Sequence, residues 1–108
     1  MANVPVQFDN VSVTCKANVY FEGKVVSHTI VTQQGAKKTL GVVYPGSFKF
    51  NTSAPERMDI ISGSCRVRIA NQADRATYGA GDFFRVPGNS HFKVEVEHGM
   101  MEYLCTFE

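Results

Sequence analysis

Short runs of alternating apolar and polar residues recur along the whole chain, and no run keeps the 3.6-residue period of a helix. In one run Phe48 and Phe50 alternate with Lys49 and Asn51, as in a half-buried strand. Gly, Pro and Asn separate the runs, which is typical of turns between strands. The pattern therefore predicts an all-β chain with almost no helix. Strands are expected near residues 11–15, 18–22, 24–31, 39–44, 48–51, 58–61, 65–70, 76–78, 82–86, 92–97 and 101–107.

Two stretches share a strand, turn, strand layout. They are GSFKFNTSAPERMDIISG at residues 46–63 and GAGDFFRVPGNSHF at residues 79–92. Two such units in a small all-β chain predict a single-domain jelly-roll β-barrel with its site inside. We place the barrel domain at residues 18–108 and treat residues 1–17 as an N-terminal extension without an assigned role.

Composition narrows the class of protein. The chain has 108 residues, 44% of them hydrophobic, which suits one folded domain with one core and one pocket. The net charge is +1 and the basic residues are scattered, so neither a nucleic-acid partner nor a membrane surface is expected.

Three cysteines, Cys15, Cys65 and Cys105, form neither an even disulfide framework nor a CxxC metal pair. The first residues lack the basic and apolar regions of a secretory signal. Reduced thiols in the cytoplasm are the simplest interpretation.

The residues from Gly46 onward are partly similar to the two cupin motifs. Glu56 and Gly63 fit the first motif, but Lys49 and Asn51 stand where its two histidines would be. Gly81, Asp82 and Pro87 fit the second motif, whose histidine position falls on Phe92 and includes His91 only if the loop is one residue shorter. Catalytic metal sites need about three protein ligands, and of the cupin ligand set only Glu56 remains, together with His91 if the loop is one residue shorter. We therefore expect no metal and no other cofactor.

The whole chain from Asn18 resembles the short single-domain cupin family of pyrimidine/purine nucleoside phosphorylases. The resemblance rests on the order and spacing of YFEGKVVS at 20–27, Thr39, Gly41, Val42, PERMDIISG at 55–63, FRVPGNSHF at 84–92 and Tyr103 to Cys105. It implies metal-independent phosphorolysis of diverse purine and pyrimidine nucleosides to free base and pentose 1-phosphate. It also implies a homodimer, which would cover the open sheet edges of one small barrel.

That reaction needs donors for phosphate, a group for the ribose hydroxyls, a proton donor for the base and an aromatic surface for stacking. The catalytic candidates are Lys49 for phosphate, Glu56 for ribose and His91 as proton donor. The candidates for substrate binding are Lys24, Ser27, Tyr44, Asn51, Arg85, Phe92 and Tyr103.

Plainer interpretations stay open for each candidate. Phe48 and Phe50 can face the core instead, which would leave Lys49 in solvent, and the sequence does not choose between the two registers. Arg85 and Lys24 can be solvated surface residues. A non-catalytic barrel that binds a small molecule is the alternative to the phosphorylase. A metal enzyme with unusual ligands is disfavoured, because the ammonium of Lys49 has no lone pair for a metal.

Overall fold

The computed structural model describes residues 4–108 and confirms the all-β, cupin-type fold. The only helical element in this part of the chain is one 3₁₀ turn, η1 (Phe21–Gly23). The strands are β1 (Ser12–Val13), β2 (Asn18–Tyr20), β3 (Val25–Val31), β4 (Lys37–Val43), β5 (Gly46–Asn51), β6 (Glu56–Ser62), β7 (Ser64–Ile69), β8 (Ala76–Gly79), β9 (Phe83–Val86), β10 (His91–Val96) and β11 (Met101–Phe107).

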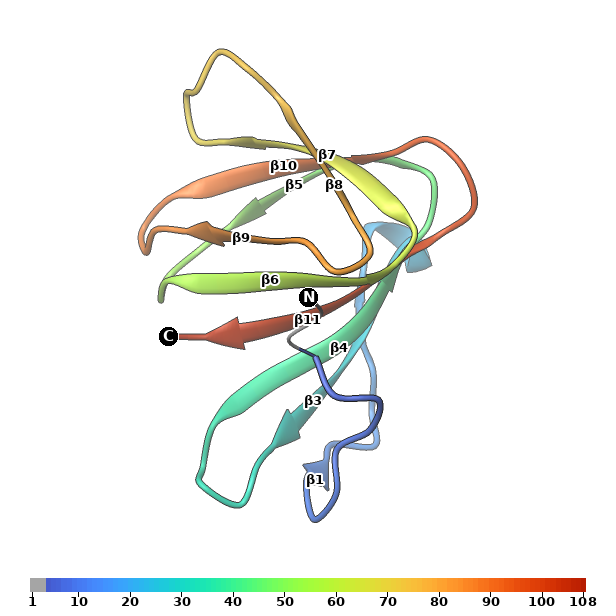
Figure 1. Ribbon diagram of the computed structural model, residues 1–108, viewed down its shortest axis with the longest axis vertical. Helices are drawn as coiled ribbons and strands as arrows, with labels where there is room; N and C mark the ends of the chain where they lie inside the picture. The colour runs from blue at the N-terminus through green and yellow to red at the C-terminus, as the bar shows by residue number, and fades with distance from the viewer. Residues whose placement is uncertain (1–3) are drawn as a thin grey trace.

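The strands form two antiparallel sheets that face one another (Figure 1). The larger sheet has the order β1-β3-β4-β11-β6-β9, and β2 also pairs with β3. The smaller sheet has the order β5-β10-β7-β8. The smaller sheet covers only part of the larger one, and the β3–β4 hairpin extends beyond it (Figure 1). This unequal cover leaves room for a cavity between the layers.

The register of the smaller sheet settles which faces point inward. Phe48 lies opposite Val94, which lies opposite Val67, and these three side chains are at most 5% exposed. Side chains alternate along a strand, so the neighbouring row points outward. That row is Lys49, Lys93 and Arg68. Of the two registers that the sequence left open, the structure therefore has Phe48 and Phe50 facing the interior.

Gly63 shows why the first motif ends in glycine. It lies between β6 and β7 with a φ of +79°, a backbone conformation that favours glycine. A side chain there would also collide with the carbonyl oxygen of Met100. The tight β6–β7 turn holds β7 in the smaller sheet directly after β6 in the larger one.

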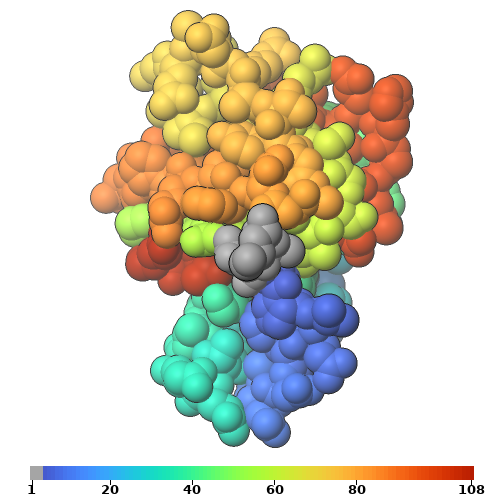
Figure 2. Space-filling model, viewed as in Figure 1, coloured from blue at the N-terminus to red at the C-terminus, as the bar shows by residue number. Residues whose placement is uncertain are grey.

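The N-terminal segment belongs to the edge of the larger sheet. β1 pairs with β3, and the amide of Thr14 donates to the carbonyl of Thr29 at 2.9 Å. The space-filling view shows this segment beside the β3–β4 hairpin at one end of the molecule (Figure 2). Within residues 4–108, no helix has the length and apolar character needed to cross a membrane.

Candidate active site

A cavity of about 610 Å³ lies between the two sheets. Its floor is the inner face of β3, β4, β11 and β6, and its roof includes Phe50, Phe92 and Val94 of the smaller sheet. Tyr20 and Phe21 contribute to its rim. A volume of this size is in the range that holds small organic ligands.

On the cavity floor, side chains that lie opposite one another on neighbouring strands form rows, and the character of these rows changes from charged to aromatic along the strands. At one end, which we call the charged end, Lys37 of β4, Phe107 of β11 and Glu56 of β6 lie side by side. The next row inward holds Thr39, Cys105 and Met58. The third row holds Ser27, Gly41 and Tyr103, after which the floor becomes apolar. A ligand lying along the strands would therefore meet charge first and aromatic surface last.

Glu56 is the acid on this floor, and it is only partly accessible to water. The thiol of Cys105 donates to its carboxylate, with Sγ 3.4 Å from Oε1. Burial raises the pKa of Glu56, and the hydrogen bond from Cys105 opposes that shift in part. Burial also raises the pKa of Cys105, and the charge of Glu56 adds to this effect. The thiol therefore stays protonated and acts as a donor to the acid.

Tyr103 lies at the deep end of the polar rows. Its side chain is 7% exposed and lies across Gly41 from Ser27, which is 3% exposed. Asn18 Nδ2 donates to Ser27 Oγ at 3.3 Å and to Thr29 Oγ1 at 3.2 Å, which holds Ser27 in place from β2. Burial raises the pKa of Tyr103 to about 12, so its hydroxyl is neutral and available to donate.

The roof is aromatic. Phe50 stacks on Phe92 with ring centroids 5.3 Å apart and an angle of 25° between planes. The ring of Phe21 meets Phe50 edge-on at 5.5 Å, and that of Phe84 meets Phe92 at 5.9 Å. Of these rings, Phe21, Phe50 and Phe92 line the cavity, and they offer a planar ligand a surface for stacking without selecting one hydrogen-bonding edge.

The structure brings together four of the residues predicted from sequence. Glu56, Ser27, Phe92 and Tyr103 all line the cavity.

Lys49 and Asn51 border the same cavity, but from the edge strand β5. Both are exposed, and Lys49 shares the outer face with Lys93. Of the two registers that the sequence left open, the pairing with β10 gives the inward positions to Phe48 and Phe50.

Four other candidates do not line this cavity. Arg85 lies on the opposite face of the larger sheet, where Nε is 3.4 Å from Glu108 Oε1. His91 pairs with Asn51 and begins β10, so the inward position belongs to its neighbour Phe92.

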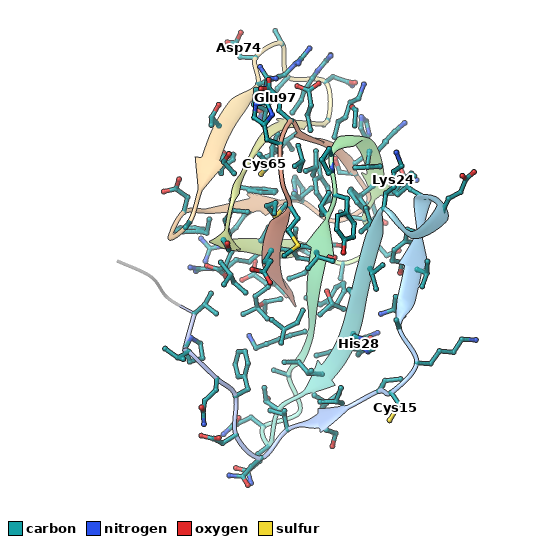
Figure 3. All side chains as sticks on the ribbon, turned by 90° about the vertical axis from the view of Figure 1, so that its right-hand side faces the viewer. Cys15, Lys24, His28, Cys65, Asp74 and Glu97 are labelled. Carbon is teal, nitrogen blue, oxygen red and sulfur yellow. The ribbon has the colours of Figure 1, made fainter. Side chains whose placement is uncertain are left out.

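Lys24 is an exposed residue that caps η1 (Figure 3). Tyr44 lies in the loop between β4 and β5, and its side chain is 44% exposed. The positions of Arg85, His91, Lys24 and Tyr44 therefore do not support a role in a reaction inside this cavity.

Among the lining residues that sequence reasoning missed are Lys37, Thr39, Cys105 and Phe107. Lys37 was assigned to a polar turn, but it begins β4. The available signal was the alternate spacing of Lys37, Thr39, Gly41 and Val43, which puts all four on one face of a strand.

The described residues contain no group of three His, Cys, Asp or Glu side chains able to hold a metal ion. Glu56 has a thiol and an aromatic ring as its neighbours on β11, and Phe92 occupies the inward position of the second motif.

The family model of pyrimidine/purine nucleoside phosphorylase matches residues 15–107, which is nearly the whole chain. This chain belongs to that family. A pyrimidine/purine nucleoside phosphorylase from Cupriavidus necator is 56% identical over 101 residues, covering 94% of this chain and 95% of that relative. Another from Methylobacillus flagellatus is 54% identical over 102 residues, covering 94% and 98%.

Solved structures agree with the fold. A protein of unknown function from Acinetobacter sp. ADP1 superimposes with a TM-score of 0.91 at 49% identity, covering 94% of this chain and 98% of that one. An oxalate decarboxylase from Bacillus subtilis has a TM-score of 0.72 at 15% identity, covering 97% of this chain and 30% of that one. At that identity the similarity concerns the fold alone.

Proposed function

We propose that this nucleoside phosphorylase family member cleaves purine and pyrimidine nucleosides with phosphate inside the cavity, yielding free base and (deoxy)ribose 1-phosphate. The observation that carries the proposal is the floor that joins a part-buried carboxylate, Glu56, to a hydrogen-bonding and aromatic end at Tyr103. The names of relatives that match almost the whole chain support the same reaction.

Each part of the reaction has a counterpart on the cavity wall. A phosphate oxygen forms a bond to sugar C1′ as the bond from C1′ to the base nitrogen breaks, and the base leaves with that electron pair and takes up a proton. Positive charge develops on the sugar, and an ionised Glu56 beside it stabilises that charge. The same carboxylate accepts hydrogen bonds from ribose hydroxyls.

Broad tolerance of the base follows from the roof. Phe50 and Phe92 present ring faces, and every nucleobase has a π-face to stack on them. Tyr103 and Ser27 supply hydroxyls that rotate to act as donors or acceptors, so neither demands one base. Purines and pyrimidines can therefore share the site.

We propose that the reaction needs no metal and no other cofactor. The support is the set of side chains around Glu56: Cys105 and Phe107 are its neighbours on β11, and Met58 is the next side chain on the same face of β6. Such neighbours do not supply the three ligands of a catalytic metal.

We also propose that the protein is a cytoplasmic homodimer. Three free cysteines suit a reducing compartment. Val19, Tyr20, Phe21 and Tyr44 are 42–60% exposed around η1, and a second copy would cover such a group of apolar side chains. A monomeric mass in sedimentation experiments at micromolar concentration would contradict the dimer.

The deciding experiment is release of free base from inosine, adenosine and uridine by protein treated with a chelator, with and without phosphate. We expect phosphate-dependent release and equimolar pentose 1-phosphate. Glu56→Gln should lower turnover by at least tenfold. Binding of nucleosides without phosphate-dependent release would instead identify a non-catalytic binding protein.

A further inference from the structure

Lys37 is a cation on the inner face of the larger sheet, and the sequence did not single it out. It begins β4, is exposed to solvent, and lines the cavity. Because Lys38 pairs with Thr106, Lys37 lies beside Phe107 on the neighbouring strand. Its ammonium nitrogen is 5.4 Å from the centre of the Phe107 ring. The aromatic ring thus supports the lysine at the charged end of the cavity.

Glu56 lies on the other side of the same ring, since it pairs with Phe107 from β6. Two strand spacings separate the backbones of Lys37 and Glu56, which is about 10 Å. Lys37 is not in an ion pair with Glu56 or with any other acid in residues 4–108. An anion can therefore approach Lys37 while Phe107 keeps it apart from the Glu56 carboxylate.

We propose that Lys37 binds the phosphate substrate, so that phosphate lies at the charged end, ribose lies near Glu56 and the base points toward Tyr103 and Phe92. This inference rests on the proposed function and adds the orientation of the ligands to it. Phosphate carries about −1.5 to −2 charges near neutral pH and requires a cation or several donors.

The dimensions of the floor suit this orientation. Gly41, the residue beneath Tyr103, comes four positions after Lys37, and four steps along a strand span about 14 Å. That span accommodates a phosphate and a nucleoside end to end.

The other cations predicted from sequence fit phosphate less well. Arg85 is on the outer face of the larger sheet, and Lys49 borders the cavity only from the edge strand β5, in a row that it shares with the outward-facing Lys93.

The test compares Lys37→Met with Lys93→Met, a matched change on the outer face of the smaller sheet. For Lys37→Met we expect the phosphate KM to rise at least tenfold, because hydrogen bonds to charged groups are lost, while the nucleoside KM changes less than threefold. Lys37→Arg should restore most of the phosphate affinity. Lys93→Met should match the wild type. An unchanged phosphate KM in folded Lys37→Met would overturn the proposal.

A second measurement separates this proposal from the proposed function. Inorganic phosphate should raise the melting temperature of the wild type and of Lys93→Met, and not that of Lys37→Met. If the wild type released no base but kept Lys37-dependent protection by phosphate, the phosphorylase activity would be refuted and the phosphate site retained. If base were released but protection were the same in all three proteins, the phosphate site at Lys37 would be refuted alone.

Discussion

The phenol ring of Tyr103 lies directly on the backbone of Gly41. A methyl group on Gly41 would be 2.6 Å from both Cζ and Oη of Tyr103, which is inside any allowed contact distance. The absence of a side chain at Gly41 therefore leaves room for the ring, which extends across β4 toward Ser27 on β3.

We predict that Gly41→Ala displaces Tyr103 and harms nucleoside binding. Overpacking of this kind costs about 1–3 kcal/mol, and the displaced ring would enter the space of the base. The nucleoside KM should rise and the melting temperature should fall. Gly79→Ala is the matched control, because a side chain there meets only ordinary contacts and Gly79 also lies in a strand. Equal behaviour of the two variants would contradict the close contact.

We predict that Glu56→Gln alters how stability depends on pH. Burial raises the pKa of Glu56 in the folded protein, so the folded state binds this proton more tightly than the unfolded state. The stability that this proton provides is complete below the ordinary carboxyl pKa of about 4.3 and is lost as pH rises through the raised pKa. Glutamine does not ionise and avoids the loss.

The check is a pair of urea unfolding curves for each protein at about pH 4 and about pH 7. The urea midpoint of Glu56→Gln, relative to that of the wild type, should be higher at about pH 7 than at about pH 4. Glu22→Gln, which changes an exposed acid in η1, should show no such gain. A gain of equal size in both variants would mean that the burial of Glu56 has no effect.

We predict that one cysteine of the three reacts quickly with a maleimide near neutral pH. Cys15 is exposed at one end of the molecule, far from the buried Cys65 (Figure 3). Burial raises the pKa of Cys65 to about 11 and also raises that of Cys105. With a pKa of about 11, the thiolate fraction near pH 7 is about 10⁻⁴, and the thiolate is the reactive form.

Mass spectrometry should show a single label per chain in the native protein and three after unfolding in urea. Cys15→Ser should remove the fast label. Fast labelling of Cys105 in the native protein would show that its hydrogen bond to Glu56 does not protect it.

We predict that Lys93→Glu stabilises the protein. Lys93 lies directly opposite both Lys49 and Arg68, and like charges in such cross-strand pairs repel. A glutamate there would replace two repulsive pairs with two attractive ones. Repulsion from Glu95, two residues further along β10, offsets part of the gain, and we expect the free energy of unfolding to rise by about 0.5 kcal/mol. Urea unfolding should show the gain, and it should shrink at about 1 M salt, where charges are screened within about 3 Å. Lys16→Glu, in a loop, is the control.

Much of the fold was predictable because its signals are local. Alternation and turn residues placed the strand at 101–107 with its exact bounds in the structure and most others within two residues. The resemblance to the family identified Glu56, Tyr103 and Ser27 at the cavity.

The orientation of single side chains was harder, because a shift of one residue turns a strand over. His91 and Phe92 differ by one position and face opposite sides, and only the pairing of β10 with β5 decides between them. Lys37 was missed for a related reason, since its polar neighbours resemble a turn until the pairing with β3 and β11 extends the strand.

The place of β11 has a consequence for biosynthesis. This strand is the last in the chain, yet it lies between β4 and β6 at the centre of the larger sheet and carries Tyr103, Cys105 and Phe107. The two halves of that sheet can therefore join only after β11 has been synthesised and has left the ribosome. Until then the inner faces of β4 and β6 are without their partner, and the nascent chain relies on late, long-range pairing of the slow-folding kind. The cavity floor is therefore completed only when β11 pairs with both of its neighbours.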